Sequence, residues 1–402
     1  MRVLQLSDVY FPRINGVSTS IDTFRRRLRE QDIDPVLVAP RYFGEPDAEG
    51  VVRVTGRTVP GDPEDRLMRL RETIARAAPI AASGVGLIHV QTPFVAHLAG
   101  RRLARKLGLP LVVSYHTLFE EYFHHYVRGV PRALTARIAR AISRHQCAQA
   151  ECVIAPSRQM RDRLLSYGVT RPIEVLPTGI ECTDFAMGDG ERFRRDHGIA
   201  PDRPVALTVS RLAFEKNIEM LVDATVHARR IRPDMLLLVA GHGPAEDALK
   251  HQVERLGLAE SVRFVGYLDR LRVLPDCYAA ADLFVFASRT ETQGLVLLEA
   301  MAAGTPVLAL PSMGARSILA GGRGCLGAPD DAAGFGRLVG DLLEHPQHLA
   351  EMSVAARRAA ADWSASAMAG RLADLYRRVA AGPRCNPSRR EHWKARTRGR
   401  PV

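Results

Sequence analysis

The stretch LFVFASRTETQGLVLLEAMAAGTPVLA, residues 283–309, decides the fold. Its apolar beginning, residues 283–287, predicts a buried strand, and the apolar run that starts near Gln293 predicts a helix that ends at Gly304. A second strand is expected at residues 306–309. A strand, a helix and a second strand joined by short loops are typical of a parallel sheet covered by helices.

The same alternation of short β-branched runs and helical patterns extends along the whole chain. It predicts an α/β protein with two doubly wound domains, each built on about six parallel strands. In the first half we expect strands at residues 3–6, 35–39, 87–90, 111–114, 152–155 and 173–176. In the second half we expect strands at residues 205–209, 235–240, 262–265, 283–287, 306–309 and 324–326.

Interruptions of this periodicity predict where the domains end. Pro-Thr-Gly and Gly-Asp-Gly, between positions 177 and 190, indicate a boundary between domains over residues 1–185 and 186–362. Residues 363–383 are expected to form a C-terminal helix that crosses back to the first domain. Residues 384–402 are basic and lack apolar periodicity, so they are expected to be a disordered tail.

The composition is that of a globular protein. Hydrophobic residues make up 46% and charged residues 25% of the 402 positions, and no run approaches the roughly 18 apolar residues of a membrane-spanning helix. Strand-like sequence begins at Val3, so we expect no signal peptide. The six cysteines are scattered without metal-ligand spacing, which favours reduced thiols in a cytoplasmic protein.

The net charge of +12 is unevenly distributed. Residues 1–185 carry +7, residues 186–383 carry −1, and the tail from residue 384 carries +6. A basic half beside a neutral half indicates an anionic partner such as phosphate, nucleic acid or lipid headgroups. The alternative is a solvated basic surface without a specific partner.

Two glutamates in residues 283–309 are the first candidates for a binding site. Glu299 lies inside the apolar run LVLLEAMAA, where a buried carboxylate needs a hydrogen-bonding partner. Glu291 lies at the mouth of the expected helix, where the free backbone N–H groups of residues 292–295 can hold an anion. This arrangement suits a ligand with hydroxyl groups at both ends and a negative centre, as in a sugar nucleotide. The alternative is a structural Glu299 that pairs with a lysine or arginine elsewhere.

Five segments together resemble glycosyltransferase family 4. The spacing of Glu291 and Glu299 is similar to that of the glutamate pair of that family. One position departs from the pattern: Asn15 stands where many members have a second glycine. The matches follow the family order over about residues 1–383. The other four segments are FPRINGV (11–17), PTGI (177–180), SRLAFEKN (210–217) and AGHGP (240–244).

The resemblance implies a GT-B fold, in which two Rossmann-like domains face each other across a cleft. It implies a retaining hexosyltransferase that moves a hexose from a UDP-glucose-like or GDP-mannose-like donor to an acceptor hydroxyl. The pattern is closest to bacterial glucosyl- and mannosyltransferases that synthesise glycolipids. The first domain would bind the acceptor and the second domain the nucleotide sugar.

The resemblance also implies roles for individual residues. Arg211 and Lys216 would stabilise the departing nucleotide diphosphate, whose negative charge needs fixed positive partners. Glu291 would contact the donor sugar, and Glu299 would bind the ribose hydroxyls. For the two cations the alternative is an ordinary surface charge, and for Gly16 an ordinary turn glycine. The expected donor-binding residues are Gly16, Arg211, Lys216, Gly241, Gly243, Thr292, Gln293, Gly294, Leu295 and Glu299.

His116 completes the expected catalytic set with Arg211, Lys216 and Glu291. It follows the strand expected at residues 111–114, where a histidine can bond a sugar hydroxyl or a phosphate. Relatives that make bacterial glycolipids have a similar pattern of histidine, threonine, aromatic and acidic residues at this place. The alternative is a histidine whose ring is satisfied by loop backbone.

No metal ion or other cofactor is expected. His124 and His125 follow His116, but no carboxylate or cysteine completes a convincing ligand set. The one Asp-x-Asp triplet, residues 32–34, precedes a strand and therefore lies at the wrong edge of the sheet for a metal-dependent transferase.

A basic amphipathic helix at residues 131–147 indicates a lipid acceptor. It carries Leu134, Ile138 and Ile142 at helical spacing with arginines between them. We expect a peripheral contact with the anionic inner face of the cytoplasmic membrane, and a glycolipid or cell-envelope acceptor. The alternative is an ordinary amphipathic helix packed on the sheet. Nearby aromatic residues are Phe119, Tyr122, Phe123 and Tyr126, and further basic residues of this half are Arg25, Arg26, Arg27, Arg29, Arg101, Arg102, Arg105 and Lys106.

Three other functions fit parts of the sequence. The acceptor of a transferase can also be a soluble sugar or a sugar phosphate. A UDP-N-acetylglucosamine 2-epimerase has the same two-domain architecture, although the glutamate pair with Arg211 and Lys216 argues against it. A nucleic-acid binder would use the basic tail, but Trp393 is its one aromatic residue, so no nucleic acid is expected.

Overall fold

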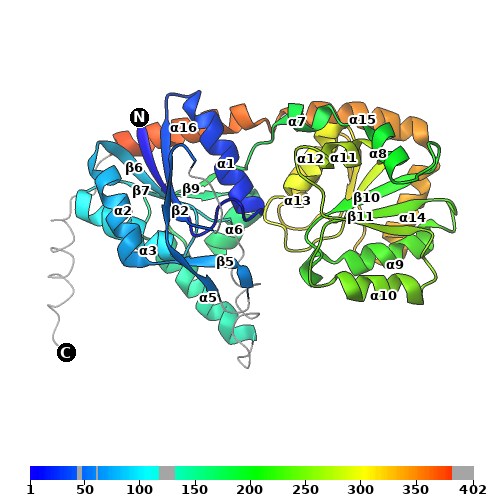
Figure 1. Cartoon of the computed structure of the whole chain (residues 1–402), viewed down its shortest axis with the longest axis horizontal. Coiled ribbons are helices and arrows are strands. Elements are labelled where there is room, and N and C mark those ends of the chain that lie inside the picture. The colour runs from blue at the N-terminus through cyan, green and yellow to red at the C-terminus, as the bar shows by residue number, and fades with distance from the viewer. Residues whose placement is uncertain (43–47, 60–61, 117–131, 383–402) are drawn as a thin grey trace. The chain divides into compact units, whose positions relative to one another are not determined.

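The computed structural model describes all residues except 43–47, 60–61, 117–131 and 383–402. The chain divides into two compact units (Figure 1). The first unit comprises residues 1–179 together with the C-terminal helix α16 (Ala365–Ala381), and the second unit comprises residues 180–364.

A parallel sheet forms the centre of the first unit. Its described strands have the order β3-β2-β1-β6-β7-β8-β9, so the direction of winding reverses between β1 and β6. Two further strands, β4 and β5, form an antiparallel hairpin. The strands are β1 (Arg2–Leu6), β2 (Asp34–Pro40), β3 (Val51–Val54), β4 (Gly56–Val59), β5 (Asp62–Met68), β6 (Val85–Val90), β7 (Leu111–Ser114), β8 (Cys152–Ala155) and β9 (Ile173–Val175).

Helices cover both faces of this sheet, and α16 is one of them. Leu372 and Tyr376 of α16 are buried in one core with Leu28 and Val112. The last helix of the chain is therefore part of the first unit. The other helices of this unit are α1 (Gly16–Arg29), α2 (Leu70–Ala82), α3 (Val95–Leu107), α5 (Arg132–Cys147) and α6 (Arg158–Ser166).

The second unit repeats the architecture with a six-stranded parallel sheet in the order β12-β11-β10-β13-β14-β15. Its winding reverses between β10 and β13. The strands are β10 (Val205–Val209), β11 (Leu236–Ala240), β12 (Val262–Gly266), β13 (Leu283–Phe286), β14 (Val307–Ala309) and β15 (Cys325–Gly327). The helices are α7 (Cys182–Ala186), α8 (Gly190–Asp196), the 3-10 turn η1 (Phe214–Lys216), α9 (Ile218–Ala228), α10 (Glu246–Arg255), α11 (Leu274–Ala279), α12 (Leu295–Ala303), α13 (Ala315–Leu319), α14 (Ala332–Leu343) and α15 (Pro346–Ala361).

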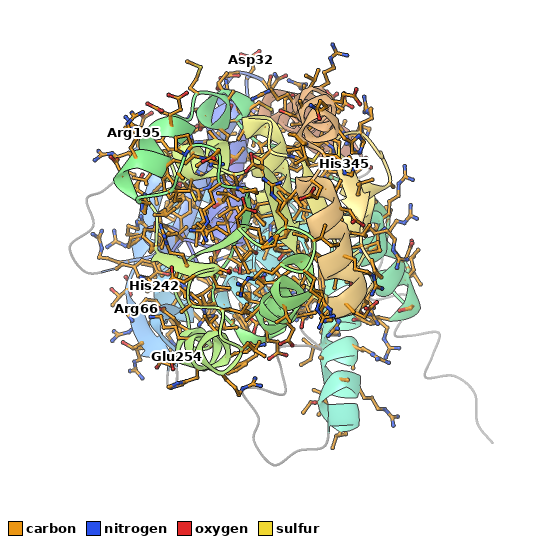
Figure 2. All side chains as sticks on the ribbon, turned by 90° about the vertical axis from the view of Figure 1, so that its right-hand side faces the viewer. Asp32, Arg66, Arg195, His242, Glu254 and His345 are labelled. Atoms are coloured by element: carbon orange, nitrogen blue, oxygen red, sulfur yellow. The ribbon has the colours of Figure 1, made fainter. Side chains whose placement is uncertain are left out.

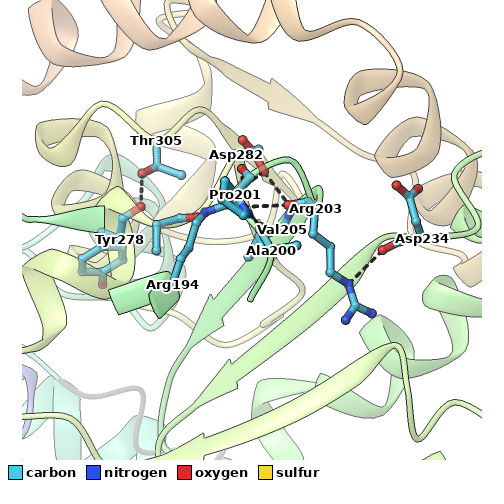
Figure 3. A network of polar contacts seen from close by, with 10 residues as sticks. Arg194, Ala200, Pro201, Arg203, Val205, Asp234, Tyr278, Asp282 and Thr305 are labelled. Carbon is cyan, nitrogen blue, oxygen red and sulfur yellow. Dashed lines mark hydrogen bonds and ion pairs between the residues drawn. The ribbon is translucent and has the colours of Figure 1, made fainter. Parts of the chain in front are cut away.

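Polar contacts fix the amino ends of β10 and β13 where the winding reverses (Figure 3). Asp282, immediately before β13, accepts a hydrogen bond from the backbone N–H of Val205 at 2.7 Å and pairs with Arg194 at 3.0 Å. Arg194 also donates to the carbonyl groups of Ala200 and Arg203. These contacts fix the register of β10 against β13 at the amino ends of the two strands.

The expected strands all occur, with ends that differ by at most two residues. The sequence patterns missed β3, β4 and β5. β3 carries Arg53, which is buried and donates to the carbonyl of Pro40, and β5 is mostly polar and charged, so neither shows an apolar alternation. Helix α12 begins at Leu295 rather than Gln293, because Gly294 has a φ of 91°, a left-handed conformation outside a helix.

Candidate active site

The strands at the reversal of the second sheet bring two distant segments together. The segment after β10 carries Arg211 and Lys216, and the segment after β13 carries Glu291. Lys216 Nζ lies 2.7 Å from Glu291 Oε2, and the two side chains are only 19% and 21% exposed. In open parallel sheets, ligands bind outside the carboxyl ends of the strands at such a reversal.

A second contact fixes the backbone around Lys216. Asn217 has a φ of 56° and is buried, and its side-chain amide donates to the carbonyl of Ala287 at 3.2 Å. Asparagine tolerates the left-handed conformation better than most residues. The turn that carries Lys216 is thereby tied to the end of β13.

Arg211 differs from Lys216 because its side chain is exposed. Among the described residues, no hydrogen bond or ion pair engages its guanidinium group. Arg211 and Lys216 lie on the same short segment after β10. This edge of the sheet therefore has one cation held by a carboxylate and one cation available to an anion.

The glycines at positions 241 and 243 have a packing role. A Cβ at Gly241 would lie 1.9 Å from the carbonyl oxygen of Ser210, and one at Gly243 would lie 2.3 Å from that of Leu212. Both glycines therefore let the segment after β11 approach the segment that carries Arg211. His242, between them, has an exposed side chain (Figure 2). Its Nδ1 lies 2.8 Å from Glu246 Oε2.

The N-terminus of α12 carries the remaining expected donor-binding residues. Gly294 is the N-cap, and no side chain caps this end of the helix. Thr292 is half-buried and Gln293 is buried, and the backbone of Thr292 packs closely on Gly314. The first N–H groups of a helix, here those of Leu295 and Val296, have no partner within the helix and attract anions, whereas that of Leu297 donates to the carbonyl of Gly294.

Glu299 is buried and has two partners. Arg270, from the segment after β12, donates to Glu299 Oε1 at 2.5 Å, and the hydroxyl of Tyr278 donates to Oε2 at 3.0 Å. Burial and the charge of Glu299 raise the pKa of Tyr278 well above its usual value, so this hydroxyl remains a donor. The pairing of Glu299 with an arginine, the structural alternative from the sequence, is thus observed.

In the first unit, His116 follows β7 and is held by the first residue after β6. Its Nε2 lies 3.1 Å from Gln91 Oε1. Burial lowers the pKa of His116 to about 4, so the ring is neutral at physiological pH. His116 and Gln91 line a cavity with room for about one water molecule.

Gly16 is the first residue of α1 in the same unit. A Cβ at this position would meet nothing within 4 Å, so the glycine is not required by packing. Asn15 caps the helix by accepting hydrogen bonds from the backbone N–H groups of Val17 and Ser18. These two donors are therefore already used by the protein.

Other sequence expectations concern metals and membranes. In the described ranges, no group of three His, Cys, Asp or Glu side chains is placed to hold a metal ion. His124 and His125 lie outside these ranges, as do the aromatic residues at 119–126 and the tail from residue 384. Of the helices that the structure describes, none is both long and apolar enough to cross a membrane.

The sequence patterns missed several residues of the site. Arg270, Tyr278 and Gln91 contact predicted site residues but were not singled out. Gln91 and Arg270 both follow strands at their carboxyl ends, and this position is the signal that identifies them. Tyr278 lies within α11 and gives no comparable signal.

Two parallel-sheet α/β units of this kind form the GT-B fold. Sucrose-phosphate synthase from Thermosynechococcus elongatus has a similar structure, with a TM-score of 0.77 and 21% identity, over 94% of this chain and 99% of that one. Anabaena HepE, solved in complex with UDP, has a TM-score of 0.73 and 20% identity, over 93% of this chain and 99% of that one.

Sequence comparisons identify the family. The model described as Glycosyltransferase Family 4 matches residues 14–184, and the one described as Glycosyl transferases group 1 matches residues 189–359. The alpha-monoglucosyldiacylglycerol synthase of Streptococcus pneumoniae is 32% identical over 321 residues, 77% of this chain and 71% of that enzyme. A GDP-mannose-dependent alpha-(1-6)-phosphatidylinositol monomannoside mannosyltransferase of Mycolicibacterium smegmatis is 36% identical over 250 residues, 59% of this chain and 65% of that enzyme.

The chain belongs to glycosyltransferase family 4. It is an enzyme, as the sequence motifs predicted, and the resemblance to this family is confirmed. The relatives are transferases, so the epimerase alternative is not favoured.

The buried pair of Arg270 and Glu299 gives a test of stability. Arg270→Met leaves a buried carboxylate without its positive partner and should lower the free energy of unfolding by about 3 kcal/mol. Arg289→Met, which breaks an exposed pair with Asp330, is the control and should cost less than about 1 kcal/mol. Urea unfolding of wild type and the two variants measures these free energies. Equal free energies of unfolding for Arg270→Met and Arg289→Met would contradict a structural role of the buried pair.

Proposed function

We propose that this chain transfers a hexose from a nucleotide diphosphate to a hydroxyl group of a membrane glycolipid or other cell-envelope acceptor. The donor is a UDP-glucose-like or GDP-mannose-like nucleotide sugar, held by the second unit, and the acceptor binds the first unit. The observation that carries the proposal is the Lys216–Glu291 pair, with Arg211 beside it, at the reversal of the second sheet. The names of two relatives support a lipid acceptor: an alpha-monoglucosyldiacylglycerol synthase and a phosphatidylinositol monomannoside mannosyltransferase.

The cations after β10 act on the leaving group. Departure of the sugar builds negative charge on the nucleotide diphosphate, and preorganised cations stabilise that charge most in the transition state. Arg211 is available to bind the diphosphate, while Glu291 holds Lys216 in place. The uncapped N-terminus of α12 supplies further N–H donors for the same anion.

The two glutamates bind hydroxyl groups of the donor. Glu291 Oε2 accepts from Lys216, and its other oxygen can accept from a hydroxyl of the sugar. Each oxygen of Glu299 has one described donor, from Arg270 or Tyr278, and one further lone pair. Glu299 can therefore accept from the ribose hydroxyls without losing its structural partners.

The reaction is proposed to be metal-independent and retaining. Arg211, Lys216 and the helix N-terminus supply the positive charge that a metal ion would otherwise provide. As the family resemblance implies, the acceptor attacks from the face that the leaving group vacates, and its proton passes to the departing phosphate. His116, neutral through burial, contacts a hydroxyl group of the reactants.

Substitution of Lys216 tests the assignment of the donor residues. Lys216→Ala should lower kcat by about 100- to 1000-fold, because it removes a fixed cation from the developing charge. Release of nucleotide diphosphate from UDP-glucose and GDP-mannose in the presence of diacylglycerol vesicles measures the rate.

Lys250→Ala is the matched control. Lys250 also pairs with a glutamate, Glu246, but both residues of this pair lie on α10. Its kcat should remain within about twofold of the wild-type value. Equal activities of the Lys216 and Lys250 variants would refute the proposed role of Lys216.

Helix α5 supports a peripheral contact with the anionic inner face of the cytoplasmic membrane. It packs through its small residues, because Thr135, Ala139, Ser143 and Cys147 are buried. The three large apolar residues are instead exposed: 49% for Leu134, 40% for Ile138 and 41% for Ile142. The large apolar side chains of α5 are therefore exposed to solvent, whereas an ordinary amphipathic helix buries them against the sheet.

Basic and apolar residues of α3 extend this surface. The side chain of Gln146 in α5 donates to the carbonyl of Pro93, just before α3, at 2.7 Å. Phe94 and Leu98 of this segment are exposed. The exposed basic residues of the two helices are Arg102, Arg105, Lys106, Arg137, Arg140 and Arg144. An apolar stripe with flanking cations suits an anionic lipid surface.

The arginines of α1 do not belong to this basic surface. Arg25 is buried and donates to the hydroxyl of Tyr10 and the carbonyl of Gly50. Arg26 and Arg27 pair with Asp22 and Glu30. The guanidinium groups of these three arginines are thus already engaged by partners within the first unit.

Flotation with vesicles tests the membrane contact. Serine at positions 134, 138 and 142 removes the apolar stripe without changing charge, and should reduce binding to vesicles of anionic phospholipid at low salt by at least about tenfold. Val354→Ser, an exposed apolar residue on α15 of the second unit, is the control and should bind as wild type does. Unchanged flotation of the triple variant would exclude α5 as the contact, and failure of wild type to float would point to a soluble acceptor.

A further inference from the structure

A chain of buried hydrogen bonds connects the C-terminal helix α16 to His116. Tyr376 of α16 contacts His89 Nδ1 at 2.5 Å, and Gln91 contacts the same nitrogen at 3.2 Å. Gln91 in turn contacts His116 at 3.1 Å. Tyr376, His89 and Gln91 are each at most 4% exposed, so water does not compete for these bonds. All four residues belong to the first unit.

The orientation of the Gln91 amide sets the direction of the hydrogen bonds in this network, since its nitrogen faces His89 and its oxygen faces His116. The amide nitrogen of Gln91 can only donate, so His89 Nδ1 must be the acceptor. Because Nδ1 accepts, the hydroxyl of Tyr376 donates its proton to the same nitrogen, and its oxygen accepts from Gln5 at 3.3 Å. The proton of His89 is therefore on Nε2, which donates to Ser114 at 2.9 Å.

This polarity determines the tautomer of His116. In this orientation of the amide, the carbonyl oxygen of Gln91 faces His116 and can only accept. A neutral His116 must then carry its proton on Nε2. Its Nδ1 keeps the lone pair and has no partner among the described residues.

We propose that Gln91, oriented by His89 and Tyr376, is a positioning residue that holds His116 as the Nε2–H tautomer and leaves Nδ1 to accept a hydrogen bond from a substrate hydroxyl. This inference rests on the proposed function, since His116 is assigned there to the reactants. It adds the nitrogen that acts, the residues that select it and the role of α16 in the chemistry of the first unit.

The surroundings of His116 are consistent with a neutral ring. Burial lowers the pKa of His89 to about 3, so neither His89 nor His116 is charged near pH 7. No Asp, Glu, Lys or Arg lines the cavity beside His116 within the described residues. The polar residues that line it come from four segments: Ser20 of α1, His89 and Gln91 of β6 and its end, Ser114 of β7, and Thr178.

Two substitutions of Gln91 separate positioning from mere packing. Gln91→Leu removes the acceptor, so the tautomer of His116 is no longer fixed, and kcat should fall by about 10- to 100-fold with little change in the KM of the donor. Gln91→Glu keeps an acceptor for Nε2–H but adds a negative charge, which raises the pKa of His116. Its kcat should approach the wild-type value near about pH 8.5 and fall toward about pH 6, where wild type remains active.

A packing defect would give a different result. It would lower the activity of both variants at every pH, with no recovery of Gln91→Glu in alkaline solution. Equal pH profiles for wild type and Gln91→Glu would overturn the inference.

NMR tests the tautomer without any assay of sugar transfer. In long-range ¹H–¹⁵N spectra of protein labelled with [¹⁵N]histidine, the signals of His116 are assigned by their loss in His116→Asn. Wild type should show an unprotonated Nδ1 and a protonated Nε2, and Gln91→Leu a mixture of tautomers. A protonated Nδ1 in wild type, or an unchanged spectrum in Gln91→Leu, would overturn the inference even if sugar transfer is confirmed. The expected spectra with no transfer would instead contradict the proposed function alone.

Discussion

The parallel pairing of β10 with β13 is the constraint on which the donor-side geometry depends. Asp282 fixes the amino ends of both strands, through the backbone of Val205 and through Arg194. The helices that follow their carboxyl ends, α9 and α12, then pack in two separate cores on opposite faces of the sheet. Lys216 and Glu291, 75 positions apart in the chain, meet at 2.7 Å because of this register. The chemistry of the second unit is thus a consequence of strand order.

The polar groups that follow β10 and β13 differ from those that follow β6 and β7. In the second unit the residues after the strands are charged, and the unengaged cation Arg211 suits a ligand that becomes more negative as it leaves. In the first unit the residues after β6 and β7 are neutral, and their polar groups form one directed hydrogen-bond chain. A neutral site can orient a hydroxyl group without attracting the diphosphate. This division of labour agrees with a donor held by one unit and an acceptor by the other.

Sequence reasoning was most successful where local patterns determine position. Most strands could be predicted because apolar runs define the sheet, and the positions of Arg211, Lys216 and Glu291 could be predicted because loops after parallel strands share one edge. The roles of these three residues stay predictions that the family resemblance implies. The partners of Glu299 could not, because Arg270 and Tyr278 come from separate elements and meet it only through tertiary packing.

Side-chain burial was also hidden from the sequence. Packing of the large apolar residues of α5 on the sheet was the alternative to a membrane contact, but the helix packs through small residues, which no periodicity of large side chains reveals. Gly241 was expected to bind the donor, and the structure shows that its missing side chain makes room for the carbonyl oxygen of Ser210 in the neighbouring loop. Arg25 was counted as surface charge, and its burial depends on contacts with Tyr10 and Gly50.

The configuration of the glycosidic product tests the central claim most directly. The enzyme would be incubated, without metal and with chelator, with α-linked UDP-glucose or GDP-mannose and vesicles that contain diacylglycerol and its glycosides, and the purified lipid would be examined by ¹H NMR. The account predicts an α-linked glycolipid and one nucleotide diphosphate released for each bond formed. A β-linked product, or an epimerised nucleotide sugar formed without acceptor, would contradict it.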